Sequence, residues 1–314
     1  MRKPRLEYEG AYYHVIVRGN QRQKVFYETG DFVRYLKYLG ETLRERAFKL
    51  YAYCLMPNHV HLFLEQRSCF PLSRTMQRLQ TAYTYFFNKR HHKSGHLFQG
   101  RYKSILVDSD TYLLQLVRYI HLNPWRAKLE ESFGKYPWSS HSQYLRKVKE
   151  SLAAVETDSV LKMLSSVKAV ARKRYREYML EGLGEGHRGD LYELRSGRIL
   201  GDEDFEEEVH RESGSGLRPR LKITKTIDQI WENLLSREGI NQEPVGWRRS
   251  RLMGEAAYWV IECAGKKQKE AADYFRVQPS TILRAVKQQE LIWKRAPEEK
   301  KKKRLGLGAC NLQF

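Results

Sequence analysis

The feature that most constrains the fold is a pair of apolar, β-prone segments, residues 48–56 and 59–66, separated only by Pro57 and Asn58. Such a short connection between two such segments is typical of antiparallel strands joined by a tight turn. Because side chains alternate along a strand, His59 and His61 project from one face and Val60 from the other. The sequence therefore predicts a hairpin that carries two imidazoles on one face.

Segments with strand and helix periodicity flank this hairpin. Residues 11–19 read as a strand between two glycines, and residues 31–46 read as a helix. A second helix begins at Leu72, where apolar residues recur at helical spacing, and residues 97–107 read as a fourth strand. The order β-α-β-β-α-β predicts an α+β, ferredoxin-like domain whose antiparallel sheet is covered on one face by two helices.

A further helix is predicted directly after the fourth strand. It should begin at Ser109 and end near Asn123, because the residue before Pro124 is pushed out of the helical region of backbone conformation. We assign residues 1–145 to this first domain.

At 314 residues and 37.3 kDa, the chain is long enough for two domains. Residues 146–223 read as a helical spacer and linker, with a helical, charged stretch over 158–180 and a flexible run, ESGSGLRPRLK, at 212–222. A second, all-α domain is expected over residues 224–293. It contains three helical segments, at about residues 252–263, 267–275 and 279–290, followed by a basic tail at 294–314.

The charge of the chain points to a polyanionic partner. There are 57 lysines and arginines against 37 aspartates and glutamates, a net charge of +20. Nucleic acid is the first candidate and an anionic membrane surface the second. No apolar run approaches the roughly 20 residues of a membrane-spanning helix, and the charged start does not resemble a secretory signal. We therefore expect a cytoplasmic protein with four reduced, scattered cysteines.

The two histidines of the hairpin are a candidate half-site for a divalent metal ion. Imidazole suits Mn, Zn, Fe or Ni better than Mg or Ca, although a catalytic site can use whichever ion is available. The alternative is two surface histidines that alternate with core residues. A second group, His91, His92 and His96, has no cysteine or carboxylate at metal-ligand spacing, and we interpret it as surface.

The end of the helix over 109–123 carries the other candidate chemistry. At about 100° per residue, Tyr119 lies on the flank of the apolar stripe and so need not belong to the core. Asn123, one turn later, places an amide oxygen beside the phenol, where it could complete a metal shell begun by the histidines. The alternative is that Tyr119 packs in the core and Asn123 merely ends the helix.

Four sequence stretches in order resemble one family. HVHLFLE with the preceding AYCLMPN, the early YHVIVRGNQRQKVF, the GHLFQGRYKS segment and the YIHLNPWRA helix end resemble the REP-associated tyrosine transposases. These belong to the single-tyrosine transposases of the HUH endonuclease superfamily. The resemblance covers roughly residues 8–145.

The resemblance implies a role for each matching residue. His59 and His61 would be metal ligands, Tyr119 the nucleophile and Asn123 an additional ligand, with Mg or Mn as the ion. Family members cut single-stranded DNA beside imperfect hairpins, through a 5′-phosphotyrosine and without ATP. The resemblance leaves open whether the chain is a monomer or a homodimer, and whether the tyrosine serves its own metal site or a partner's.

Other side chains are candidates for holding DNA. After the first strand and on the predicted fourth strand, these are Arg18, Gln21, Arg22, Arg101 and Lys103, although each alone is as consistent with ordinary solvated charge.

In the second domain, residues 269–282 resemble the helix-turn-helix of the bacterial replication initiator's DNA-binding domain, without the glycine that such turns often contain. Its candidate groove-reading residues are Ser280, Thr281, Arg284, Lys287 and Gln288. A small helical protein-binding bundle is the alternative.

These expectations combine into a leading hypothesis and two rivals. The leading one is a metal-dependent single-stranded DNA endonuclease and strand transferase that also contacts flanking duplex DNA and associates with the nucleoid. One rival is a non-catalytic DNA-binding regulator that retains the fold. The other is a metal-dependent hydrolase with no covalent intermediate, which would tolerate loss of Tyr119 but not of the two histidines.

Overall fold

The computed structural model describes residues 6–68, 70–146, 151–184, 191, 194–195, 198–212, 226–240, 244–262 and 266–295. The chain divides into two compact units. The first consists of Met1–Leu6, Gly10–Arg67 and Thr75–Arg218, and the second of Glu7–Glu9, Ser68–Arg74 and Pro219–Phe314. Residues 213–222 of the predicted linker and residues 296–314 of the predicted basic tail lie outside the described residues.

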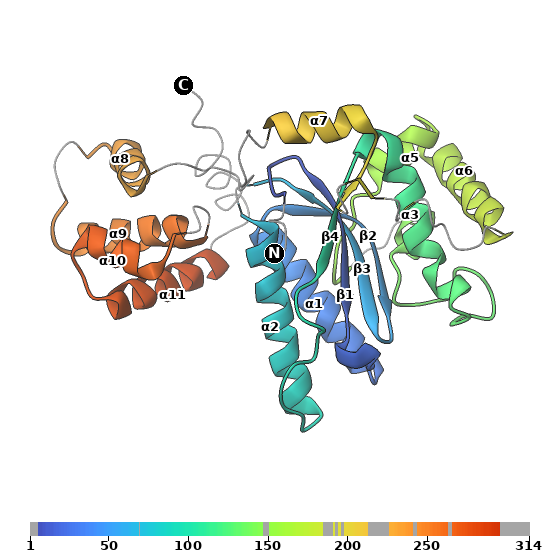
Figure 1. Ribbon diagram of the computed structural model, residues 1–314, viewed down its shortest axis with the longest axis horizontal. Coiled ribbons are helices and arrows are strands. Elements are labelled where there is room, and N and C mark those ends of the chain that lie inside the picture. The colour runs from blue at the N-terminus through green and yellow to red at the C-terminus, as the bar shows by residue number, and fades with distance from the viewer. Residues whose placement is uncertain are drawn as a thin grey trace. The chain divides into compact units, whose positions relative to one another are not determined.

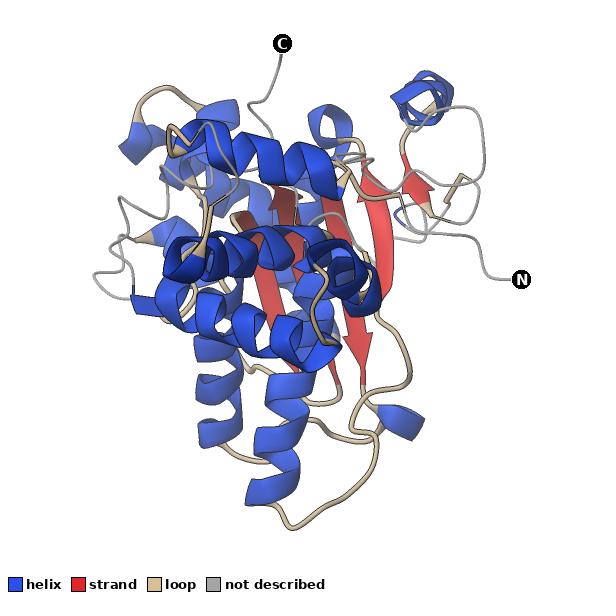
Figure 2. Cartoon of the chain, turned by 90° about the vertical axis from the view of Figure 1, so that its left-hand side faces the viewer, coloured by secondary structure: helices blue, strands red, loops and turns tan. Residues whose placement is uncertain are grey.

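The first unit is built on a five-stranded sheet (Figure 1). Its strands are β1 (Tyr12–Arg18), β2 (Phe48–Met56), β3 (His59–Gln66), β4 (Lys103–Val107) and β5 (Ile199–Leu200). The spatial order is β2-β3-β1-β4-β5, with antiparallel neighbours except for the parallel pair β4 and β5. Figure 2 shows these strands together in red. The predicted α+β fold with a ferredoxin-like order of the first four strands is confirmed, and β5 is an addition at the edge.

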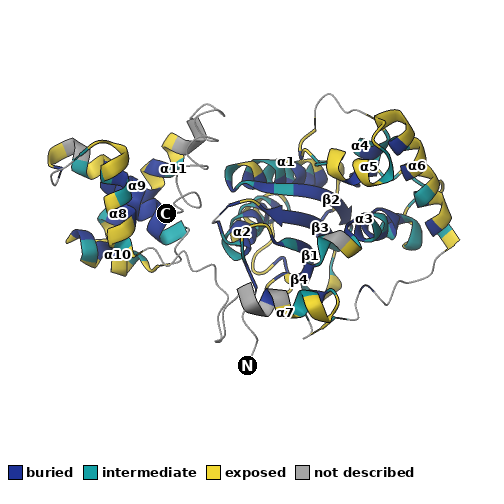
Figure 3. Cartoon of the chain, turned by 90° about the horizontal axis from the view of Figure 1, so that it is seen from above, coloured by how far each residue is buried: buried dark blue, intermediate teal, exposed yellow. Residues whose placement is uncertain are grey.

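Helices cover both faces of this sheet (Figure 3). On one face lie α1 (Thr29–Glu45) and α2 (Leu72–Arg90). On the other lies α3 (Ser109–Arg126), which shares a buried core with the smaller helices that follow it. These are α4 (His141–Leu145), α5 (Asp158–Leu164) and α6 (Lys168–Glu181). A short 3-10 turn, η1 (Asn20–Arg22), lies between β1 and α1, and a second, η2 (Gly182–Gly184), follows α6. Helix α7 (Glu203–Glu212) comes after β5.

Two predicted boundaries at β4 and α3 are wrong for local reasons. Residues 97–102 are not part of β4, because after a single bridge between Gly19 and Phe98 the chain turns at Gly100, whose φ is +63°. Helix α3 continues through Pro124 to Arg126. Proline removes a donor from the last turn, but the Asn123 amide donates to the carbonyls of Tyr119 and Ile120, at 3.0 and 3.5 Å, so the turn persists.

The helical stretch predicted over 158–180 is two helices. The backbone becomes extended at Ser165, whose φ is −169°, and α6 starts again after Val167. The hydroxyl of Ser165 accepts a hydrogen bond from the Val167 amide at 3.2 Å, a local side-chain bond that competes with a continuous helix.

The second unit contains four helices in its described part. These are α8 (Ile227–Arg237), α9 (Gly246–Glu262), α10 (Gln268–Phe275) and α11 (Pro279–Arg295). Helix α9 contacts the other three. Three of the helices follow the predicted segments, whereas α8 was not predicted. Helix α8 starts at a capping box: the Thr226 hydroxyl accepts from the backbone N–H of Gln229 at 3.2 Å, and the Gln229 side chain accepts from the backbone N–H of Thr226.

Candidate active site

Strand pairing gathers imidazoles on the face of the sheet that packs against α3. The register of β1 with β3 places Ile16 opposite His61 and Arg18 opposite His59. Alternation along the strands puts His14 on the same face. Phe63, two residues after His61, lies in the core shared with α3, which identifies the face. The two histidines of the hairpin therefore point toward the helix that carries Tyr119.

The ring of His59 is oriented by its neighbour Asn58. The Nδ1 atom of His59 lies 2.7 Å from the Asn58 side-chain oxygen, and the Asn58 amide nitrogen donates to the carbonyl of Arg22 at 3.3 Å. Since the amide oxygen can only accept, Nδ1 of His59 carries the proton. The lone pair of His59 is then on Nε2, which is the atom left to bind a metal ion.

His61 is held in a matching way by His14. The Nε2 atom of His14 lies 2.9 Å from Nδ1 of His61, and their rings stack with centroids 5.2 Å apart at 24°. Which of these two nitrogens donates the hydrogen bond and which accepts it depends on the tautomers of the two rings. If Nδ1 of His61 donates, its Nε2 carries the lone pair, as in His59. In that arrangement His14 is the acceptor that selects the tautomer.

All three imidazoles are kept neutral. Burial, followed by the charge of Lys103, lowers the pKa of His14 to about 3. Burial and then Arg18 lower the pKa of His59 to about 4. The pKa of His61 lies well below its usual value, first because of burial and then because of its neighbours His14, His59 and Arg18. Neutral imidazoles whose Nδ1 atoms are engaged in hydrogen bonds leave Nε2 for a divalent ion, so the donor set of His59 and His61 fits the metal that the motif implies.

Helix α3 places the ring of Tyr119 edge-on against these histidines. Its centroid is 6.1 Å from that of His61 and 6.0 Å from that of His14. The guanidinium carbon of Arg126 is 5.4 Å from the same ring. Tyr119 is only 5% exposed and belongs to the buried core, which is the alternative that the sequence left open for its packing. Periodicity along α3 does not reveal this burial, because the flank of the helix that carries Tyr119 packs against the histidines of the sheet, beside the apolar stripe of α3.

Asn123 is half-buried one turn after Tyr119. Its amide nitrogen is engaged by the helix carbonyls described above, which leaves the side-chain oxygen as the atom that could serve as a ligand. The sequence argument placed Asn123 in a metal shell, and it stays a prediction.

A buried hydrogen-bond network fixes α3 from its other side. The Tyr175 hydroxyl of α6 lies 2.7 Å from Nδ1 of His121 and 2.8 Å from Nδ1 of His141. The second nitrogen of His121 lies 2.7 Å from the Ser140 hydroxyl. His121 is two residues from Tyr119, so this network sets the rotation and depth of the helix. The sequence assigned no role to Tyr175, because its partners lie 34 and 54 residues away.

The candidate strand-binding residues lie around the same end of the sheet but are not one cluster. Arg18 and Lys103 are exposed on neighbouring strands, and both act electrostatically on the histidines. Burial lowers the pKa of Lys103, and the charge of Arg18 lowers it further. Gln21 and Arg22 are exposed in a turn with φ of 48° and 60°. Arg101 lies in the loop before β4, not on the strand as predicted.

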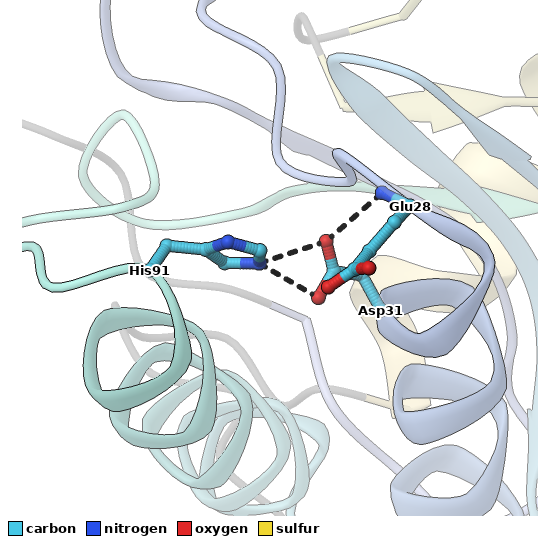
Figure 4. Close-up of side chains that lie close together, drawn as sticks. All are labelled: Glu28, Asp31 and His91. Carbon is cyan, nitrogen blue, oxygen red and sulfur yellow. Dashed lines mark hydrogen bonds and ion pairs between the residues drawn. The ribbon is translucent and has the colours of Figure 1, made fainter.

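His91, interpreted from the sequence as a surface residue, has carboxylate partners from the start of α1 (Figure 4). Its Nε2 lies 2.9 Å from Asp31, and Arg90 pairs with Glu28 at 2.5 Å. Glu28, Asp31 and His91 are close enough to hold a cation. However, Asp31 also accepts from the amides of Tyr27 and Glu28, so the described contacts make this cluster a capped helix start docked onto the end of α2.

In the second unit, α10 and α11 are joined by a turn at residues 276–278. Arg276 adopts the left-handed conformation there, with φ of 54°, which is the role that glycine often takes. The candidate groove-reading residues Ser280, Arg284, Lys287 and Gln288 are exposed on α11, and Thr281 is half-buried.

Residues 7–123 match the family model of the IS200-like transposases. The match covers 117 of the 314 residues and shows that this part of the chain is similar to these transposases. The match includes His14, His59, His61, Tyr119 and Asn123. A solved REP-associated tyrosine transposase bound to a REP hairpin is similar over 50% of this chain and 93% of its own, at 16% identity and a TM-score of 0.41. No curated protein sequence matches the chain. None of the described helices is long and apolar enough to cross a membrane.

The bond between His14 and His61 predicts an effect of His14 on the affinity of the candidate site for a divalent ion. His14→Ala removes the partner of Nδ1, and we expect Mn²⁺ to bind about 10- to 100-fold more weakly, the usual effect of losing such a support. His14→Gln restores an acceptor oxygen and should recover most of the affinity. Titration calorimetry or Mn²⁺ electron paramagnetic resonance measures this directly. The control His92→Asn removes an exposed imidazole. Equal affinity in wild type and His14→Ala would contradict the assignment.

The Tyr175 network predicts a loss of stability when its hydroxyl is removed. Tyr175→Phe leaves two buried imidazoles short of a partner, which should lower the free energy of unfolding by about 1–3 kcal/mol. Urea denaturation measures this. The control is Tyr178→Phe on the same helix. This change also removes a hydroxyl, but it keeps the ring, whose centroid lies 4.1 Å from the Arg118 guanidinium carbon. A Tyr175→Phe protein as stable as this control would show that the network does not hold α3.

Proposed function

We propose that the first unit cuts and rejoins single-stranded DNA through a covalent bond to Tyr119, with His59 and His61 as metal ligands. The observation that carries the proposal is the convergence, within one chain, of a phenol ring and two neutral imidazoles that each have Nδ1 occupied. A phenol nucleophile next to a ready metal half-site is what phosphoryl transfer to tyrosine requires.

The bond changes follow from this arrangement. The Tyr119 hydroxyl gives up its proton and its oxygen attacks phosphorus, while the bond from phosphorus to the 3′ oxygen breaks. That oxygen takes up a proton and leaves as a 3′-OH, and the strand stays attached as a 5′-phosphotyrosine. Attack by another 3′-OH reverses the step, breaks the bond to Tyr119 and joins two strands. Each step exchanges one phosphodiester bond for another and none is hydrolysed, so no nucleoside triphosphate is needed.

The surrounding residues supply the charge for this step. A divalent ion, Mg²⁺ or Mn²⁺, held by His59 and His61 with the Asn123 oxygen, would polarise a phosphoryl oxygen and stabilise the charge that builds up at phosphorus. Arg126 places a positive charge beside the ring of Tyr119, where negative charge gathers as the proton leaves. Arg18 and Lys103 supply exposed positive charge for the DNA backbone on the same side of the sheet.

The proposed substrate is hairpin-forming DNA, on the strength of the motifs shared with REP-associated enzymes. For the second unit, we propose that α11 contacts flanking duplex DNA through Ser280, Thr281, Arg284, Lys287 and Gln288. Support comes from the exposure of four of these side chains on one helix that follows a tight turn. A protein-binding helical bundle predicts no such contact.

Covalent capture tests the mechanism. Labelled single-stranded hairpin DNA is incubated with Mg²⁺ or Mn²⁺, and adducts are resolved on denaturing gels. We expect wild type to form an adduct, and Tyr119→Phe, which lacks the nucleophilic oxygen, to lose it by several orders of magnitude. His59→Ala and His61→Ala should also lose it. The control Tyr112→Phe, on the same helix, should retain it.

Each rival makes a different prediction in this assay. Cleavage by Tyr119→Phe without an adduct would indicate the hydrolase, and no reaction of wild type across a panel of hairpins would indicate the DNA-binding regulator. Either result would overturn the proposed mechanism.

A further inference from the structure

A hollow of about 620 Å³ opens beside the turn that follows β1, and none of its lining residues belongs to the candidate active site described above. One wall is the exposed side of α2, with Gln80, Thr84 and Tyr85. The lining also contains Asn20 from the turn after β1 and Phe98 from the segment before β4. The lining thus combines two aromatic rings, the imidazole of His96, two amides and the hydroxyls of two threonines and a tyrosine.

Tyr85 is unusual for a large side chain on this helix. It is 71% exposed, whereas Tyr83 and Phe87, two residues to either side, are fully buried. The ring contributes nothing to the core between α2 and the sheet. An open aromatic face beside a hollow is the surface on which a nucleobase stacks, and such stacking tolerates any base.

Gln80 supplies an unsatisfied polar group to the same hollow. Its amide nitrogen is buried and has no hydrogen-bond partner among the described residues. Buried donors are nearly always paired, so an unpaired one that lines a hollow points to a missing acceptor. Thr84 lies one turn further along α2 and adds a hydroxyl. These groups match the edge of a base, which carries both donors and acceptors.

The lining also distinguishes a base from a phosphate. No lysine or arginine is among the residues that line the hollow, although the chain carries 57 of them. A phosphate site would place cations or several backbone amides at its centre. A hollow with an aromatic wall and without lysine or arginine instead suits the part of a nucleotide that carries no charge.

A rigid turn links the hollow to the metal half-site. Asn20 belongs to the turn that starts at Gly19, where an added Cβ would lie 2.2 Å from the Gln23 carbonyl, so only glycine fits. The Gly19 amide donates to the Asn58 carbonyl at 2.8 Å, and the Asn58 side chain orients His59. A base held against Asn20 would thereby be held in a fixed relation to His59, the proposed metal ligand.

We propose that this hollow binds one unpaired nucleobase of the DNA strand, stacked on Tyr85 and hydrogen-bonded to Gln80. The site would select which phosphodiester reaches Tyr119. The inference rests on the proposed function, because it takes the substrate to be a single strand. It assigns that strand a base-binding site which the charge distribution alone does not reveal.

The test is a binding measurement without catalysis. Fluorescence anisotropy in EDTA gives the affinity of the full chain for a hairpin with single-stranded flanks. A series of otherwise identical oligonucleotides carries one abasic residue at each flanking position in turn. We expect Tyr85→Ala to bind the intact strand about 5- to 150-fold more weakly, the fold-change that corresponds to 1–3 kcal/mol per stacked base. Tyr85→Phe keeps the ring and should bind as wild type does.

The abasic series identifies the base. At one position, the abasic residue should weaken binding to wild type but have no further effect on Tyr85→Ala, because both changes remove the same contact. Gln80→Leu should alter the base preference at that position alone. The exposed α2 residue Gln77, changed to Ala, is the control.

Two results would overturn the proposal. Unchanged affinity in Tyr85→Ala would do so, and so would a loss that adds to the abasic effect at every position. The outcome is separable from that of the covalent assay, since a base site can exist without an adduct to Tyr119 and an adduct can form without this base site.

Discussion

The pairing of β1 with β3 is the contact on which the candidate active site depends. It places His14 where its ring stacks on His61 and hydrogen-bonds to it. A slip of one residue would turn every side chain of β1 to the other face, replace His14 with an apolar neighbour and leave Nδ1 of His61 without a partner. The buried apolar residues Tyr13, Val15 and Val17 prevent this slip, because they occupy the opposite face of the same strand.

The second constraint is the position of α3. The sheet alone does not determine how far this helix is rotated, and the turn at its end contains a proline. Helix α6 supplies the missing constraint through Tyr175, whose hydroxyl lies between two imidazoles. The helices after residue 157 thus share a core with the helix that carries Tyr119, and the position of Tyr119 depends on residues well beyond the family match.

Much of this fold could be predicted from local sequence. The bounds of β2 and β3 coincide with the predicted ones, since a two-residue turn between apolar runs has few alternatives. Boundaries failed where a local detail decides them, as at the turn around Gly100 and in the last turn of α3, where the Asn123 side chain bonds to the helix carbonyls. Among candidate site residues, His59, His61 and Tyr119 stand out by motif and lie together. His14, Asn58 and Tyr175 were missed, because their importance is a hydrogen bond to a distant or adjacent ring, and spacing along the chain does not reveal it.

The central claim is that His59 and His61 both carry their proton on Nδ1 and present Nε2. Long-range ¹⁵N–¹H correlation spectra of the histidine-labelled, metal-free protein at neutral pH distinguish the two tautomers of each ring. The account predicts the Nδ1-protonated form for both residues, with a change at His61 alone in His14→Ala. A proton on Nε2 of either His59 or His61 would contradict it.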